Sequence, residues 1–277
     1  MRKLNLKNGD QVPVLGMGTW RMGENASRRA AEIKALQAGI DLGMTLIDTA
    51  EMYGNGGSEE VVGEAIRGRR QDVYLVSKVL PSNASRAGTI AACEASLKRL
   101  GTDHIDLYLL HWRGGFKLAE TLNGFLDLVK AGKIGAFGVS NFDLKDMNEW
   151  LALPGADHTV ADQVQYNLES RGIEFDLLPW TQRQSIAVMA YCPLAQGDIP
   201  KAGGLQQVAK RHQATTAQIM LAWCLRQPNV LAVPKSSNPQ RIAENAEAAE
   251  IELSVEDIAA LDGDFPAPRG VEPLAMT

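Results

Sequence analysis

The chain has 277 residues, 45% of them hydrophobic, and its 28 Lys and Arg against 33 Asp and Glu give a net charge of −5. This length and composition suit one soluble α/β barrel domain of about 250 residues. A mildly acidic chain without a block of basic residues is a poor candidate for binding nucleic acid or an anionic membrane surface.

The sequence carries no evident membrane segment or export signal. No stretch approaches the ~20 apolar residues that a membrane-spanning helix needs, and the N-terminus lacks the apolar run of a signal peptide. The three cysteines, Cys93, Cys192 and Cys224, are odd in number and far apart, which argues against a disulfide framework or a zinc site. We therefore expect a reduced cytoplasmic protein without a bound metal.

The chain opens with a hairpin signal. Asn8-Gly9 separates two short alternating segments, Lys3–Leu6 and Gln11–Val14, and this dipeptide is typical of a two-residue hairpin turn. Eight apolar segments then predict strands. They are Val14–Met17, Met44–Ile47, Val73–Ser77, Ile105–Leu110, Ile134–Val139, Ala161–Val164, Ile186–Ala190 and Val230–Val233.

Amphipathic patterns between these segments predict helices. The first is expected to begin near a cap at Ser27 and to end at Gly43. Further along, Thr215 with Gln218 has the signature of a capping box. Pro179 must start or interrupt a helix, because proline has no N–H to donate.

Eight strands that alternate with helices are typical of a (β/α)8 TIM barrel, here preceded by an N-terminal β-hairpin. The structural alternative, a doubly wound open sheet, would have a Gly-rich dinucleotide turn after its first strand. The only candidate, Gly16-Met17-Gly18, lacks the third glycine and no helix follows at once. Without a linker or an internal repeat, residues 1–277 are expected to form a single barrel domain.

Polar or aromatic residues stand at the end of each predicted strand. In a barrel these ends face one shared pocket, which is where barrel enzymes carry their active sites. Any one such residue is more often structural than catalytic, but their convergence on one rim by accident is far less probable. The residues are Gly18-Thr19-Trp20, Asp48, Ser77-Lys78, His111-Trp112, Ser140-Asn141, Gln163, Tyr191-Cys192 and Lys235-Ser236-Ser237.

The residue types indicate a tuned general acid. Tyr53, on the loop after Asp48, has an ordinary pKa of about 10, which is too high for an efficient proton donor at neutral pH. A neighbouring Lys78 would lower that pKa, and the carboxylate of Asp48 would keep the lysine charged. His111 could hydrogen-bond the same substrate oxygen. Since no nucleophile or metal cluster accompanies them, the group that attacks carbon must come from a cofactor, and hydride is the obvious candidate.

The last predicted strand leads into a phosphate-binding pattern. A helix is expected to begin at Pro239 with Asn238 as its cap. Its free N–H groups, with Lys235, Ser236 and Arg241 beside them, would form an anion site. Barrels commonly bind phosphate at the loops after strands seven and eight.

These motifs together resemble the aldo-keto reductase superfamily over essentially the whole chain, and within it short-looped bacterial members that reduce 2-oxoaldehydes such as methylglyoxal. The matching motifs are Gly16-Met17-Gly18-Thr19-Trp20, Asp48-Thr49-Ala50-Glu51-Met52-Tyr53-Gly54, Leu110-His111-Trp112, Gly138-Val139-Ser140-Asn141-Phe142, and Pro234-Lys235-Ser236 through Arg241, Glu244 and Asn245.

The resemblance implies a role for each of these residues. It implies a tetrad of Asp48, Tyr53, Lys78 and His111, and NADPH as cofactor. The nicotinamide amide would be held by Ser140, Asn141 and Gln163 with Tyr191 stacked on the ring, and the 2′-phosphate by Lys235, Ser236 and Arg241, with Glu244 and Asn245 near the adenine. The remaining expected cofactor contacts are Gly18, Thr19, Trp20, Asp48, Pro193, Leu194, Gln196 and Ser237.

The substrate pocket expected from the same resemblance is partly aromatic. It comprises Trp20, Tyr53, Leu80, His111 and Trp112, a set suited to small aldehydes and ketones. Leu80 stands where many relatives carry tryptophan, and the loop of Leu194 to Gly197 departs from the usual Leu-Gly-Ser pattern. We expect a monomer.

Two other functions are compatible with parts of the pattern. Lys78 at a strand end could be the Schiff-base lysine of an aldolase, with Tyr53 and Asp48 moving protons. A slow NADPH-binding regulatory protein would keep the fold and the cofactor. The complete tetrad favours a reductase over both.

Overall fold

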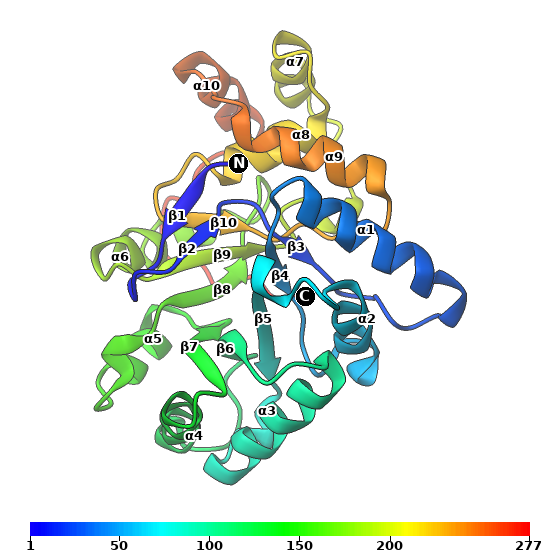
Figure 1. The fold of residues 1–277 in the computed structure, drawn as a ribbon. Coiled ribbons are helices and arrows are strands. Elements are labelled where there is room, and N and C mark those ends of the chain that lie inside the picture. Colours follow the sequence, from blue (N-terminus) through cyan, green and yellow to red (C-terminus); the bar gives the residue numbers. More distant parts are fainter.

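The computed structural model describes residues 1–277, which form a parallel barrel surrounded by helices (Figure 1). The N-terminal hairpin pairs β1 (Lys3–Asn5) with β2 (Gln11–Pro13) in antiparallel register. The turn between them contains Gly9 at a φ of +94°, a conformation that glycine adopts without strain. The predicted hairpin is therefore confirmed, although its turn has three residues, Lys7 to Gly9, between the bonded Leu6 and Asp10 rather than two.

The barrel strands follow one another in space in their order along the chain, and neighbours pair in parallel. The ring closes between the first and last strands, because Leu15 bridges Ala232 and Gly18 bridges Lys235. The predicted (β/α)8 fold is confirmed. The strands are β3 (Met17–Gly18), β4 (Leu46–Asp48), β5 (Tyr74–Val79), β6 (Ile105–Leu110), β7 (Ile134–Ser140), β8 (Ala161–Gln165), β9 (Ala187–Tyr191) and β10 (Val230–Ala232).

Ten α-helices accompany the strands, and most of them pack around the outside of the barrel (Figure 1). Helices α7 and α10 pack against each other beyond this ring. The helices are α1 (Arg29–Asp41), α2 (Gly57–Ala65), α3 (Arg86–Leu100), α4 (Leu118–Lys130), α5 (Leu144–Leu151), α6 (Leu177–Arg183), α7 (Gly203–Arg211), α8 (Thr216–Cys224), α9 (Pro239–Glu247) and α10 (Val255–Asp264).

Helix starts follow the expected chemistry, with one correction. Thr215 and Gln218 form the reciprocal capping box ahead of α8, and Pro179 lies in the first turn of α6. The cap expected at Ser27 was wrong. The side chain of Asn25 instead accepts the Ser27 N–H at the start of a short 3₁₀ turn, because an Asx side chain reaches the N–H two residues on.

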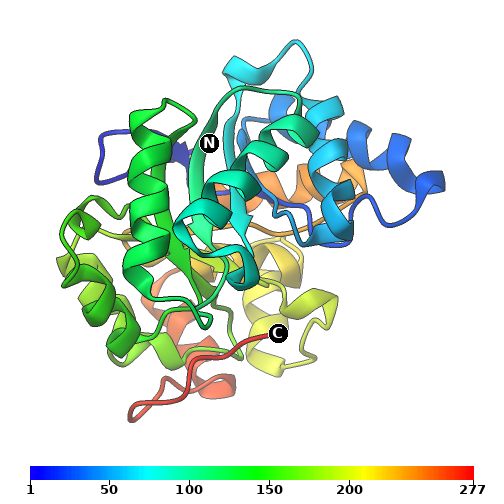
Figure 2. The same cartoon turned by 90° about the horizontal axis from the view of Figure 1, so that it is seen from below.

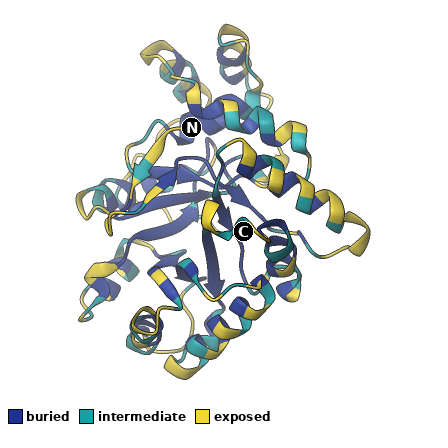
Figure 3. Cartoon of the chain, in the orientation of Figure 1, coloured by how far each residue is buried: buried dark blue, intermediate teal, exposed yellow.

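Apolar residues fill two layers. A smaller cluster lies inside the barrel, and a larger one lies between the strands and the helices. Figure 3 shows the barrel strands mostly buried, while the hairpin strand β1 and the outer faces of the helices are exposed. After α10 the chain has no further helix or strand, and its last segment (red in Figure 2) returns to the barrel, where Thr277 Oγ1 lies 3.9 Å from Cys192 Sγ just beyond β9. No helix is both long and apolar enough to cross a bilayer.

Candidate active site

The carboxyl ends of the barrel strands surround a cavity of about 1280 Å³. This volume exceeds the ~300–1,000 Å³ of ordinary small-molecule sites, which leaves room for a dinucleotide and a substrate together. Of the catalytic, cofactor-binding and substrate-pocket residues expected from the resemblance, Lys78 lies behind the wall and Leu80 lies outside the cavity. Those that line it are Gly18, Thr19, Trp20, Asp48, Tyr53, His111, Trp112, Ser140, Asn141, Gln163, Tyr191, Pro193, Leu194, Gln196, Lys235, Ser236, Ser237, Arg241, Glu244 and Asn245.

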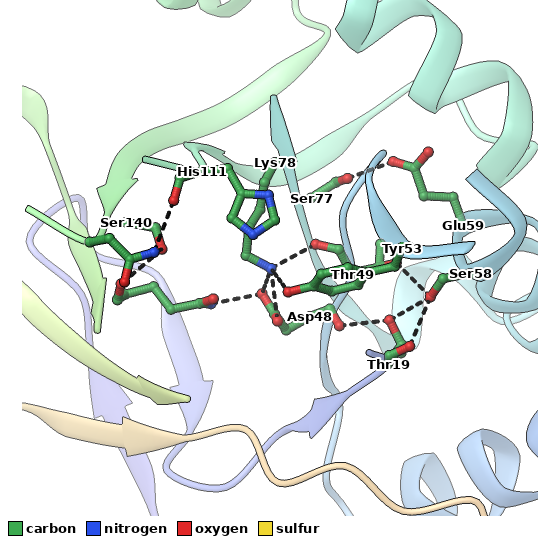
Figure 4. Close-up of polar contacts among 12 residues, drawn as sticks. Thr19, Asp48, Thr49, Tyr53, Ser58, Glu59, Ser77, Lys78, His111 and Ser140 are labelled. Atoms are coloured by element: carbon green, nitrogen blue, oxygen red, sulfur yellow. Dashed lines mark hydrogen bonds and ion pairs between the residues drawn. The ribbon is translucent and has the colours of Figure 1, made fainter. Parts of the chain in front are cut away.

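Lys78 is the centre of a buried polar cluster (Figure 4). Its Nζ lies 2.9 Å from Asp48 Oδ2, 2.9 Å from the Thr49 carbonyl and 3.3 Å from the Tyr53 hydroxyl. The lysine is completely buried. Because an ammonium has three N–H donors, each finds one acceptor and none is left over. Asp48 Oδ1, which also lies 2.8 Å from Lys78 Nζ, accepts a hydrogen bond from Gln163 at 2.8 Å.

Strand register brings these groups together. β4 pairs with β5 so that Asp48 lies opposite Val76, and Lys78 follows two residues later on the same face. Tyr53 begins a short 3₁₀ turn beyond β4, in which Gly54 and Gly56 adopt positive φ. Glycine permits this tight return, which points the tyrosine back toward the lysine.

Burial and charge set the protonation of the cluster. Burial lowers the pKa of Lys78, but the adjacent Asp48 and Tyr53 outweigh burial and the net shift is upward, so the amine stays charged. Burial raises the pKa of Tyr53, and Lys78 opposes that rise without cancelling it. The lowering effect of Lys78 expected from the sequence is present. It is smaller than the effect of burial, which sequence reasoning omitted.

His111 is neutral. Burial, with a further contribution from the charge on Lys78, lowers the pKa of His111 to about 2. Its ring meets Tyr53 edge-on, at 5.7 Å between centroids, and meets Trp112 at 4.8 Å. The buried Nδ1 atom has no hydrogen-bond partner. At neutral pH the imidazole can hydrogen-bond a ligand oxygen but does not add positive charge to the site.

A second cluster of amides and hydroxyls lies at the ends of β7, β8 and β9. Asn141 donates to the His111 carbonyl at 3.1 Å and accepts from the Tyr191 hydroxyl at 2.8 Å. The residue adopts a φ of +59°, which turns the chain sharply after β7. Ser140 donates to the Gln163 carbonyl at 2.8 Å. These bonds fix the side chains in place around the cavity wall.

The opposite end of the cavity is rich in cations. Arg21 and Arg28 from the loop after β3 join Lys235 and Arg241 in its lining. None of the four forms an ion pair, whereas Arg29 next to them pairs with Glu60 and Glu64. Burial lowers the pKa of Lys235. Unpaired cations near the start of a helix, here α9 with Asn238 as its cap as expected, are chemically suited to phosphate groups.

One expected pocket residue is misplaced. Leu80 does not line the cavity, and its N–H donates to Glu51 Oε1 at 2.6 Å as the chain enters a 3₁₀ turn at Pro81. Other lining residues on loops, Arg21, Arg28 and Met52 among them, were not expected from the sequence. The only signal in the sequence was that they flank the Trp20 and Tyr53 motifs.

The fold and this arrangement of Asp48, Lys78 and Tyr53 define an NAD(P)-dependent carbonyl reductase built on a barrel. Residues 14–263 match the aldo/keto reductase family, and the chain belongs to that family. It is 50% identical over 275 residues to methylglyoxal reductase YeaE of Escherichia coli, covering 97% of each chain. It is 36% identical over 262 residues to glyoxal reductase of Bacillus subtilis, covering 94% of this chain and 91% of the other.

Solved structures agree with this placement. An aldo/keto reductase from Klebsiella pneumoniae in complex with NADP and acetate is 48% identical, with a TM-score of 0.96 and 99% of each chain covered. A second structure of aldo-keto reductase from that organism, in complex with NADPH, has the same identity and TM-score. In the present chain no group of three or more His, Cys, Asp or Glu side chains is arranged to hold a metal ion.

Proposed function

We propose that the protein uses NADPH to reduce small aldehydes and ketones, with 2-oxoaldehydes such as methylglyoxal among its substrates, and that Tyr53 is the proton donor. The observation that carries the proposal is the contact of Lys78 with Asp48, the Thr49 carbonyl and Tyr53 at the wall of a cavity large enough for a dinucleotide. The cofactor, when bound, supplies hydride to the carbonyl carbon.

Tyr53 is well suited to protonate the carbonyl oxygen. Because burial raises the pKa of Tyr53, the phenol carries its proton at neutral pH. Lys78, 3.3 Å away, favours the phenolate that forms once the proton has left. A positioned acid of this kind is worth roughly 10² to 10⁴ in rate.

His111 has a different part in the proposal. Its pKa of about 2 keeps the ring neutral, so it does not compete with Tyr53 as the acid. The ring lines the same cavity beside Tyr53 and Trp112. We assign it the role of orienting the carbonyl oxygen toward the tyrosine.

The cavity residues fit a nicotinamide dinucleotide phosphate. The amides of Asn141 and Gln163 with the hydroxyl of Ser140 offer hydrogen bonds for the carboxamide, and Tyr191 offers a ring face. The unpaired Lys235 and Arg241, joined by Ser236, match the charge of the 2′-phosphate. Gly18, Thr19, Trp20, Pro193, Leu194, Gln196, Ser237, Glu244 and Asn245 are assigned to the remainder of the dinucleotide.

The geometry is unfavourable for a Schiff-base aldolase. Lys78 has no exposed surface, and all three of its N–H groups are engaged. Its raised pKa keeps the amine protonated, and a protonated amine has no lone pair with which to attack a carbonyl.

NADPH oxidation with a panel of aldehydes, ketones and 2-oxoaldehydes tests the proposal. We expect turnover with small aldehydes by the wild-type protein and a large loss in Tyr53→Phe. A folded protein that binds NADPH and oxidises it with no member of the panel would contradict the proposal. We further expect a monomer acting in the cytoplasm; size-exclusion chromatography with light scattering checks the first, and fractionation of cells checks the second.

A further inference from the structure

A chain of buried hydroxyl groups lies behind the proposed proton donor (Figure 4). Ser58, in the first turn of α2, has its Oγ 3.0 Å from Thr49 Oγ1 and 2.7 Å from Thr19 Oγ1. Thr19 Oγ1 in turn donates to the Asp48 carbonyl at 2.9 Å. All three hydroxyl-bearing residues have no exposed surface, so they cannot exchange these partners for water.

Counting hydrogens gives the chain one direction. Each hydroxyl has a single hydrogen to donate. Thr19 gives its hydrogen to the Asp48 carbonyl, and Ser58 gives its own to Thr19. Thr49 must therefore donate to Ser58, so the Ser58 hydroxyl links the hydroxyls of Thr49 and Thr19.

Both ends of this chain reach the proposed tetrad. The Asp48 carbonyl, which also accepts the Thr19 N–H at 3.0 Å, belongs to the residue whose carboxylate pairs with Lys78. The Thr49 carbonyl is one of the three acceptors of Lys78 Nζ. The hydroxyl chain thus holds the main chain on both sides of the peptide bond that joins Asp48 to Thr49.

We propose that Ser58 is a positioning residue for carbonyl reduction: its hydroxyl, through Thr49 and Thr19, fixes the acceptors that place the Lys78 ammonium against Tyr53. This inference rests on the proposed function. Lys78 favours the phenolate of Tyr53, so a displaced ammonium makes the phenol a weaker acid. The remaining titratable groups near Tyr53 are Asp48, His111, Tyr191 and Cys192, and none of them contacts Ser58.

The sign of the expected change follows from the direction of proton transfer. Reduction needs Tyr53 in its protonated form, so the rate is full below the pKa of Tyr53 and falls above it. Without the Ser58 hydroxyl, the pKa of Tyr53 rises. The upper limb of the pH–rate profile should then move to higher pH while the maximal rate falls.

The test uses Ser58→Ala, Thr49→Val and the double variant. The control is Ser96→Ala, which also removes a fully buried serine hydroxyl, but one that contacts Arg99 away from the cavity. In Ser58→Ala we expect kcat to fall about tenfold, a fraction of the ~10²–10⁴ that a general acid contributes. The upper limb should rise by about half a pH unit. The KM for the carbonyl and the Kd for NADPH should stay within about twofold, because ground-state contacts are untouched.

Thr49→Val should reproduce this pattern, since it removes the neighbouring link of the same chain. The double variant should be no worse than either single variant. A folded Ser58→Ala with the kcat and pH profile of Ser96→Ala would overturn the inference, as would additive losses. If Ser58→Ala does not fold, the pH profile of Thr49→Val decides. A wild-type protein that reduces no carbonyl would instead contradict the proposed function. The two outcomes are distinguishable, because one is measured on the variants and the other on the wild-type protein.

Discussion

The two ends of the cavity are built on opposite principles. At the proposed proton donor, Lys78 is fully buried and its three N–H groups are all bonded within the protein. At the other end Arg28, Lys235 and Arg241 are exposed and have no ion-pair partner. At the Lys78 end the charges have their partners within the free protein, whereas the cations at the other end gain a partner only when an anion binds.

This difference follows from what each end must do. Groups that stabilise charge in a transition state act best when they are already oriented, because no reorganisation is then needed as the charge develops. A buried charge without partners would be costly, so this end must supply its own partners. The end with Arg28, Lys235 and Arg241, which we call the phosphate end, has to exchange its proposed ligand with each turnover. Exposed cations let the phosphates of that ligand enter from water.

The largest loss of activity is expected at the Lys78 end of the cavity. Tyr53→Phe keeps the ring and its packing but removes the only proton that the cluster can give to a carbonyl oxygen. We expect kcat to fall by roughly 10² to 10⁴. Stopped-flow measurement of hydride transfer, rather than steady-state turnover alone, isolates the chemical step.

Affinity for NADPH should be nearly unchanged in Tyr53→Phe, and this serves as the internal control. If Tyr53→Phe retained more than about half of the wild-type rate of hydride transfer, Tyr53 would not be the proton donor, since general acid catalysis contributes far more than twofold.

At the phosphate end the effect should be on binding and should depend on the cofactor. NADPH differs from NADH by the 2′-phosphate, and a hydrogen bond to a charged group contributes about 1.5–3 kcal/mol. At about 1.4 kcal/mol per tenfold, Arg241→Ala should weaken NADPH binding by roughly ten- to a hundredfold. NADH affinity should barely change. Fluorescence titration with both cofactors measures this, and equal losses for the two would place the 2′-phosphate elsewhere.

The two ends also differ in how far the sequence could predict them. Asp48 and Lys78 stand at the ends of apolar strands, so strand pairing alone predicts that they meet. Arg21 and Arg28 lie on an irregular loop where no periodicity indicates which side chains face the cavity. Leu80 was wrongly placed in the pocket, because the bond from its N–H to Glu51 depends on a turn that the strand pattern does not encode.

The net shift in the pKa of Tyr53 was also not predictable from the sequence. Lys78, which lowers this pKa, is evident from the sequence, but the burial that raises it more is not. Burial depends on packing from several strands at once. The role proposed for Ser58 also depends on packing. In the sequence it is an ordinary serine near the start of a helix, and only the fold places the threonines at the ends of β3 and β4 beside it.

Trp112 lines the cavity beside His111 and is partly exposed. It should affect neither proton donation nor cofactor binding but only the room left for the substrate. In Trp112→Ala we expect the ratio of kcat/KM for bulky over small aldehydes to rise about fivefold, a modest value for a hydrophobic pocket contact. Trp180→Ala on α6, outside the cavity lining, is the control. An unchanged ratio across a size series would place Trp112 outside the pocket.

The smallest expected effect separates two neighbouring arginines. Arg28 lines the cavity and is close enough to Lys235 to help lower its pKa, whereas Arg29 pairs with Glu60 and Glu64 outside the cavity. Exposed charge contacts are worth about 0.2–1 kcal/mol, so Arg28→Ala should weaken NADPH binding by up to about fivefold, more than it weakens NADH binding. Because salt screens exposed charges, the loss should shrink as ionic strength rises. Arg29→Ala carries the same change of net charge and should leave both affinities unaltered. If the two variants behave alike, the effect is one of overall charge, and the loop after β3 is not part of the phosphate site.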